Sequence, residues 1–112
     1  MNNVIRRIRD DFRKNDTVCS QVVGLFQLIS NKGRFRIICL LTQGEFCVHE
    51  IMEAVGGCKL SNISQQLKAL ALAGVVERRR EDRRILYRLR DERVRNMIGF
   101  LRRQFLEGDS KP

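Results

Sequence analysis

The 112-residue chain is poor in three residue types: it has no tryptophan, a single histidine and a single proline, Pro112. Because proline ends or kinks helices, its near absence allows uninterrupted helices, and glycine marks most boundaries. One histidine, without a glycine-rich phosphate loop or a carboxylate pair, offers too few groups for acid–base or nucleophilic catalysis. We therefore do not expect an enzyme. A thiol-dependent enzyme is the alternative that the cysteines leave open.

Long hydrophobic runs are also missing. The longest apolar stretch, residues 69–76 with its glycine counted, has eight residues, whereas a membrane-spanning helix needs about 20. The N-terminal segment MNNVIRRIRDDFRKND carries charges throughout and has no hydrophobic segment of the signal-peptide type. The sequence thus predicts a cytoplasmic protein with no membrane partner. In a reducing cytosol we expect free thiols, metal ligands or redox sensors, not structural disulfides, from its four cysteines: Cys19, Cys39, Cys47 and Cys58.

Negative charge is in the minority: 22 Lys and Arg face 13 Asp and Glu, for a formal net charge of +9. Arginine supplies most of this charge and makes planar, bidentate contacts with phosphate or guanine. So large an excess in so small a domain is typical of nucleic-acid-binding proteins. The length suits one compact domain with a thin core, which a dimer sharing apolar helices would extend.

Hydrophobic spacing predicts the order of the elements. Apolar residues recur at helical intervals in these segments: about residues 4–12, 18–29, 34–42, 47–55, 59–73 and 91–106. After Gly74 the period changes to two, which predicts strands at 75–80 and 84–89 joined by a charged turn at 81–83. Helices, a hairpin and a last helix predict a mainly α (α+β) winged helix-turn-helix fold. We divide the chain into an N-terminal basic helical arm, residues 1–15, and a DNA-binding and dimerisation domain, residues 16–112.

A polar helix face and a basic hairpin follow one another in the chain. The outward face of the predicted helix 59–73 carries serine and amide side chains, which read base edges. The hairpin has five arginines against three acids from Glu77 to Arg84. In a winged helix the helix enters the major groove and the hairpin lies along the adjacent backbone or minor groove. We therefore predict contacts with double-stranded DNA from Ser61, Asn62, Ser64, Gln65, Gln66, Lys68, Arg78, Arg80, Arg83 and Arg84. A winged helix that binds RNA or protein is the other possibility.

Two long segments carry a family resemblance. They resemble the ArsR/SmtB family of bacterial repressors and read RFRIICLLTQGEFCVHEIMEAVGG and SNISQQLKALALAGVVERRREDRRILYRL. The similarity extends from about Ser20 to Glu107. The resemblance implies a homodimer formed by the first and last helices. It also implies an operator that is an imperfect inverted repeat, and release from DNA when an inducer is sensed. The two recognition helices would lie about one turn of DNA apart, roughly 34 Å.

The same resemblance offers two kinds of sensor. Metalloid sensors of the family hold ligands at the start of the helix after the Gly-Glu turn, where this chain has Cys47, His49 and Glu50. A thiophilic metal or metalloid ion would be their cofactor. Sulfide and redox sensors have a reactive cysteine at the end of the preceding helix, as Cys39 is here, and a partner cysteine where this chain has Leu106.

Several alternatives stay open at this point. Cys19 or Cys47 could replace the missing partner thiol. A cysteine among aliphatic side chains, as Cys39 is, is commonly an inert small hydrophobe. A thiol near a helix N-terminus, as Cys47 is, is favoured as a thiolate by the helix dipole. A family member with no inducer site is the remaining alternative.

Overall fold

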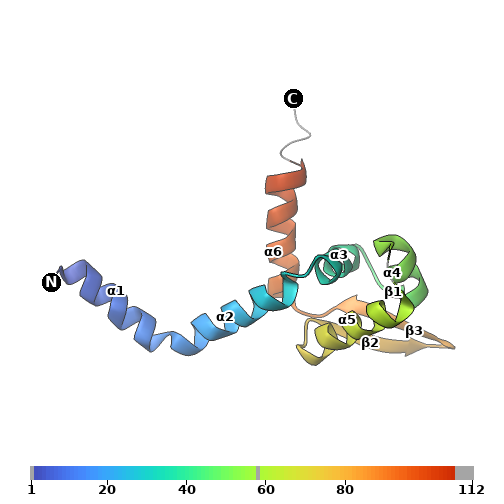
Figure 1. The fold of residues 1–112 in the computed structure, drawn as a ribbon, viewed down its shortest axis with the longest axis horizontal. Coiled ribbons are helices and arrows are strands. Elements are labelled where there is room, and N and C mark those ends of the chain that lie inside the picture. The colour runs from blue at the N-terminus through green and yellow to red at the C-terminus, as the bar shows by residue number, and fades with distance from the viewer. Residues whose placement is uncertain (1, 58, 108–112) are drawn as a thin grey trace. The chain divides into compact units, whose positions relative to one another are not determined.

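The computed structural model describes residues 2–57 and 59–107 and has two compact units. The boundary between them along the chain falls after Asn31. The first unit contains α1 (Asn3–Lys14) and α2 (Asp16–Ile29). The second has a longer series of elements (Figure 1): α3 (Lys32–Leu41), β1 (Phe46–Cys47), α4 (Val48–Val55), α5 (Leu60–Leu72), β2 (Val76–Glu81), β3 (Arg84–Leu89), α6 (Glu92–Arg102) and a π-helical turn (Arg103–Glu107). Cys58 and residues 108–112 of the predicted domain lie outside the described residues.

The first unit consists of two helices separated at Asn15. The side chain of Asn2 caps α1 by accepting the backbone N–H of Val4 at 2.8 Å. Asn15 ends that helix by donating its side-chain amide to the carbonyl of Asp11, also at 2.8 Å. Apolar side chains along both helices are between 41% and 64% exposed: Val4, Ile5, Ile8, Phe12, Val18, Val22, Val23 and Phe26. The assignment of residues 1–15 to a separate arm stays a prediction.

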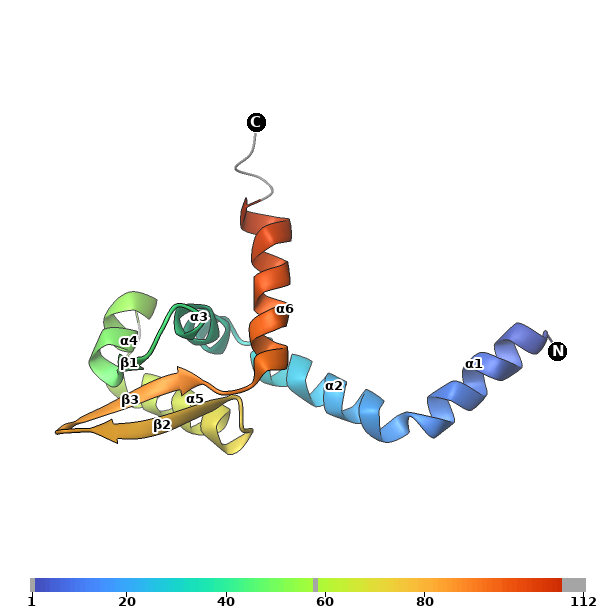
Figure 2. The same cartoon turned by 180° about the vertical axis from the view of Figure 1, so that it is seen from behind.

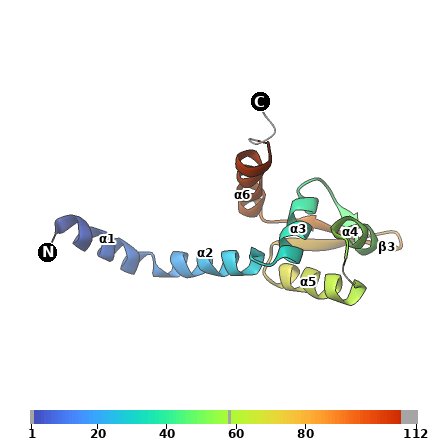
Figure 3. The same ribbon diagram turned by 45° about the horizontal axis from the view of Figure 1, so that its top comes forward.

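The second unit packs helices and a sheet around an aliphatic core. Helix α5 contacts β2, whereas α3 and α4 contact β3 (Figures 2 and 3). The helical spacing read from the sequence is confirmed by the side chains that are fully buried, which include Ile37, Ile38, Leu41, Ile51, Ile63, Leu67, Leu70, Val94 and Ile98. Among the described helices, none has the length and apolar content required to cross a bilayer.

The sheet is antiparallel, with strand order β1-β3-β2. The predicted hairpin is confirmed: Glu81 pairs with Arg84, and Asp82 turns the chain in the left-handed region, at φ 55°. Strand β1 was not predicted, because two residues are too few to show an alternating pattern. Its second residue, Cys47, precedes α4 as the N-cap and does not open the helix as expected. The mainly α (α+β) class is confirmed.

Candidate nucleic-acid interface

Helix α5 has one buried and one polar face. Ile63, Leu67 and Leu70 enter the core, whereas Leu60 and Leu72 at the two ends of the helix are exposed. The polar side chains are exposed, as the spacing predicted: Ser61, Asn62, Ser64, Gln65 and Lys68. The preceding turn uses Gly56 and Gly57 at φ +72° and +64°, values that side chains with a Cβ rarely adopt. This turn joins α4 to α5 as a helix-turn-helix pair. Serine, amide and ammonium groups on one exposed helix face suit base edges and phosphates.

Gln66 differs from the other predicted contacts on α5. It is half-buried, and its Oε1 accepts a hydrogen bond from Arg34 Nη1 at 2.9 Å. Its Nε2 donates to Asn62 Oδ1 at 3.3 Å. Both amide atoms of Gln66 thus form hydrogen bonds within the protein. Arg34 was missed in the sequence analysis because it precedes its partner by 32 residues and no local pattern links them.

One face of the hairpin adjoins the polar side of α5. Residues directly opposite in the antiparallel ladder share a face, so Arg78 lies with Tyr87, and Arg80 lies with Ile85. We call these four residues the groove face. Arg78 and Tyr87 line a groove with residues of α5, among them Ser64 and Lys68. In the part of the chain that the structure describes, neither Arg78 nor Arg80 forms an ion pair.

The opposite face of the hairpin, called the paired face below, has its charges neutralised. It consists of Glu77, Arg79, Glu81, Arg84, Leu86 and Arg88. Arg79 binds Glu45 through two nitrogens, at 2.7 and 3.0 Å, and Glu81 at 3.3 Å. Arg84 binds Glu50 of α4 at 3.0 Å, and Arg88 binds Glu77. Of the arginines predicted to contact DNA, Arg84 therefore already has a carboxylate partner, whereas Arg83 in the turn makes no ion pair within the described residues.

Hydrogen bonds favour the charged forms of the ion-pair partners on the paired face. The hydrogen bond from Arg79 lowers the pKa of Glu45. The backbone N–H of Cys47, together with Arg84, lowers the pKa of Glu50. In return, Glu45 raises the pKa of Arg79 above its ordinary value. Positive charge on this side is thus balanced by carboxylates, while the groove face carries arginine without acid.

The described cysteines, Cys19, Cys39 and Cys47, are free thiols, the first exposed and the other two half-buried. Burial raises the pKa of Cys39, and the charge of Arg102 partly offsets this. Cys39 lines a cavity of about 580 Å³ together with Leu106. The two positions that the resemblance associates with a thiol pair therefore share one cavity, and only one of them is a thiol.

Cys47 lies where α4 meets the hairpin. Its backbone N–H donates to Glu50 Oε1 at 2.8 Å, the reciprocal bond of a capping box. A hydrogen bond to the Cys47 side chain, followed by the charge of Glu50, raises the pKa of Arg84. Through Glu50, the N-cap at Cys47 is therefore linked to an arginine of the hairpin.

Among the residues that the structure describes, no three His, Cys, Asp or Glu side chains are grouped so that they could hold a metal ion. The Glu50 carboxylate is engaged by the backbone N–H of Cys47 and by Arg84. The joint site expected from Cys47, His49 and Glu50 stays a prediction.

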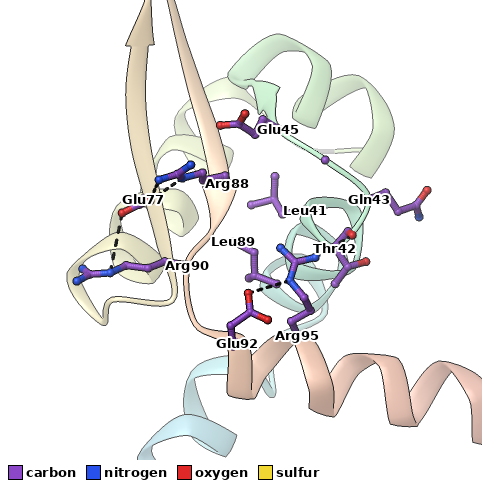
Figure 4. A pocket seen from close by; sticks show the side chains of 11 residues that line it. Leu41, Thr42, Gln43, Glu45, Glu77, Arg88, Leu89, Arg90, Glu92 and Arg95 are labelled. Atoms are coloured by element: carbon purple, nitrogen blue, oxygen red, sulfur yellow. Dashed lines mark hydrogen bonds and ion pairs between the residues drawn. The ribbon is translucent and has the colours of Figure 1, made fainter.

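A cavity lined by charged side chains lies away from α5, at the base of the hairpin (Figure 4). It has a volume of about 530 Å³, and three arginines and three glutamates line it. Glu77 pairs with Arg88 and Arg90, and Arg95 pairs with Glu92 at 3.4 Å. Arg95 also donates to the carbonyl of Thr42 at 3.0 Å, which joins α6 to the end of α3. The ion pairs balance the charges of this cavity and connect the hairpin, α3 and α6. None of the predicted DNA contacts lines the cavity.

Comparisons with known proteins agree with this architecture. Residues 31–78 match the model of the family described as bacterial regulatory protein, arsR family. A biofilm growth-associated repressor of Xylella fastidiosa is 32% identical over 100 residues, which cover 89% of this chain and 84% of that protein. Two solved structures are similar in fold and sequence. A homodimeric winged helix-turn-helix DNA-binding domain from Mycobacterium bovis is 34% identical, with a TM-score of 0.69 over 80% of this chain and 82% of its own.

Reduced HlyU from Vibrio cholerae, the other structure, is 28% identical, with a TM-score of 0.78 over 84% of this chain and 98% of its own. The predicted winged helix-turn-helix fold is thereby confirmed. Helix order, hairpin and sequence all agree with one assignment: the chain belongs to the arsR family of bacterial regulatory proteins.

Proposed function

We propose that the protein is a transcriptional repressor that binds an imperfect inverted repeat in double-stranded DNA as a homodimer. One observation carries this proposal: the exposed polar side of α5 shares a groove with Arg78, which has no acidic partner among the described residues. Helix α5 would enter the major groove, where Gln65 reads a base edge. Lys68, Arg78, Arg80 and Arg83 would contact phosphates and supply affinity that depends on salt.

The dimer is supported by exposed apolar surface. Besides the side chains on α1 and α2, Phe100, Phe105 and Leu106 near the end of the chain are between 54% and 67% exposed. Large apolar side chains that are exposed in such numbers are typical of a protein interface. The related Mycobacterium bovis domain is homodimeric. Two-fold symmetry would place the two α5 helices on successive turns of one side of the duplex.

We also propose that a thiol senses the signal that releases the repressor, with reactive sulfur, an oxidant or a thiophilic metal or metalloid as the chemical class. Cys47 is the best placed of the candidate thiols because it is the N-cap of α4 and its backbone N–H binds Glu50, the partner of Arg84, so a modification there would disturb the hairpin. Cys39 and Cys19 are the other candidates. A modification that favours one of two dimer conformations by about 1–3 kcal/mol would change DNA affinity by a similar amount.

DNA binding is tested by selecting duplexes from a random library with the full chain. We expect the selected sites to contain two half-sites, and Gln65→Ala to relax the preference at one base pair in each. Sedimentation of the free protein should give a dimer. Binding that ignores sequence, or a monomer on DNA, would contradict the proposal.

Sensing is tested with the reduced protein bound to a selected duplex. Arsenite, a persulfide or peroxide is added, and release is followed by fluorescence anisotropy. If thiols sense the signal, Cys39→Ser combined with Cys47→Ser abolishes release. Unchanged release by all three reagents in that variant would exclude these two thiols and leave Cys19 as the remaining candidate.

A further inference from the structure

The side chains of Arg34, Gln66 and Asn62 form a series of hydrogen bonds from α3 to the exposed face of α5. Arg34 Nη1 donates to Gln66 Oε1 at 2.9 Å, and Gln66 Nε2 donates to Asn62 Oδ1 at 3.3 Å. Arg34 and Gln66 are half-buried, whereas Asn62 is exposed. The series thus begins in the partly shielded region between two helices and ends on the surface that the proposed function assigns to DNA.

Because arginine can only donate, the hydrogen bonds from Arg34 through Gln66 to Asn62 all run from donor to acceptor in that order. A guanidinium has donors only, so the Gln66 atom that it contacts must be the amide oxygen. Gln66 consequently turns its NH₂ group toward Asn62, whose oxygen accepts. No described residue accepts from the hydrogens on Asn62 Nδ2, which are left for a partner such as DNA. Without Arg34, the terminal torsions of both amides would have two nearly equivalent orientations.

We propose that Arg34 is a positioning residue for sequence recognition. Acting through Gln66, it holds Asn62 as a hydrogen-bond donor toward DNA, so that Asn62 selects a base that presents an acceptor. In the major groove, guanine, adenine and thymine each present an acceptor, whereas cytosine presents only its amino donor. Cytosine is therefore disfavoured on the strand that Asn62 contacts. This proposal rests on the proposed function and adds a determinant of specificity that does not itself touch a base.

A direct contact between Arg34 and phosphate is the competing role, and it predicts a different result. Loss of a phosphate contact weakens binding to every duplex alike and lowers the slope of log affinity against log salt by about 0.9. Loss of a positioning residue weakens discrimination between bases and leaves binding to random duplexes nearly unchanged. Affinity and discrimination must therefore be measured together.

The experiment compares Arg34→Ala with Arg36→Ala in the full chain. The control removes the same charge from an exposed position of α3 that has no part in these hydrogen bonds. Affinity is measured for a duplex selected by the wild-type chain, for its single-base variants and for a random duplex. We expect Arg34→Ala to reduce discrimination by about 5- to 30-fold at one position in each half-site. Arg36→Ala keeps that discrimination, and Arg34→Lys, which retains a donor, restores part of it.

Gln66→Glu tests the direction of the bonds. The new carboxylate accepts from Arg34 but cannot donate to Asn62, so Asn62 rotates its NH₂ group inward and presents its oxygen to DNA. A second selection with this variant should change the preferred base at one position of each half-site to one that presents an amino donor, cytosine or adenine, so that cytosine is no longer disfavoured. An unchanged preference would contradict the proposal.

A readout without DNA separates the two proposals. Side-chain amide signals of Asn62 and Gln66 in ¹⁵N–¹H spectra of the free protein should shift in Arg34→Ala and stay in place in Arg36→Ala. Unmoved amide signals, or equal weakening on all duplexes with a lower salt slope, would overturn the role of Arg34 alone. A wild-type chain that selects no sequence would contradict the proposed function and this role with it.

Discussion

The two faces of the β2–β3 hairpin are built from one arginine-rich stretch of sequence and differ in how its charges are neutralised. On the paired face, Arg79, Arg84 and Arg88 each bind a glutamate. On the groove face, Arg78 and Arg80 bind none within the described residues, and Arg78 adjoins α5.

The number of arginines in a wing is therefore no measure of its DNA-binding surface. Alternation along the strand separates the arginines into two sets, and acids from elsewhere in the fold engage one of them. Exposed ion pairs contribute little to stability, so their main consequence is that the paired arginines are less available to phosphate. The following predictions test this contrast, beginning with the largest effect.

Stability should depend on the buried Leu86 more than on its exposed neighbour in β3. Leu86 is 7% exposed, whereas the adjacent Ile85, on the groove face, is 41% exposed. We expect Leu86→Ala to lower the free energy of unfolding by about 2–4 kcal/mol, because it leaves a cavity. Ile85→Ala should cost less than about 1 kcal/mol. Urea unfolding at one protein concentration measures both, and equal losses would contradict this difference in burial.

Removing the acidic partner of a paired-face arginine should make that arginine available to contact DNA phosphate. Glu50→Gln releases Arg84 while glutamine still serves the capping box of α4. We expect a steeper salt dependence for a random duplex, by about 0.9 in slope per protomer, and affinity several-fold tighter at low salt. Glu53→Gln is the control, since it removes the same charge from an exposed position of α4. Identical slopes for the two variants would show that Arg84 does not reach phosphate even when it is released.

The smallest effect concerns acid stability. The bond from Arg79 lowers the pKa of Glu45, and the Cys47 backbone N–H lowers that of Glu50. Both groups bind protons less readily in the folded chain than in the unfolded one. Their contribution to stability is therefore present above the ordinary carboxyl pKa and is lost as the pH falls through the lowered values. We expect a small decline from about pH 5 to pH 3.

Urea titrations over that pH range measure the decline. Glu45→Gln combined with Glu50→Gln should flatten it, and Glu53→Gln should leave it unchanged. A decline of the same size in the double variant would assign the acid sensitivity to other carboxylates.

Local spacing was sufficient to predict the helices, the hairpin and the outward face of α5. A period of 3.6 residues places Ile63, Leu67 and Leu70 inside and the serine and amide side chains outside. Strand β1 could not be predicted, because its two residues pair with a strand some 40 positions later in the chain and leave no periodic trace.

Contacts between residues far apart in the chain could not be predicted from the sequence either. Glu45 and Arg79 are 34 residues apart, as are Glu50 and Arg84, and only the folded chain brings them together. Glu50 is one of the predicted metal ligands, and its bond with Arg84 could not be read from the sequence for the same reason. Nothing in the local pattern distinguishes Arg78 from Arg79; the register of the hairpin does.

The salt dependence of binding to a random duplex shows which face of the hairpin contacts phosphate. It is measured for the wild-type chain, for Arg78→Ala combined with Arg80→Ala, and for Arg79→Ala combined with Arg88→Ala. We predict that the groove-face pair lowers the slope by about 1.8 per protomer, or 0.9 for each lost phosphate contact, and that the paired-face variant keeps the wild-type slope. The opposite order, or equal losses in both variants, would contradict the account.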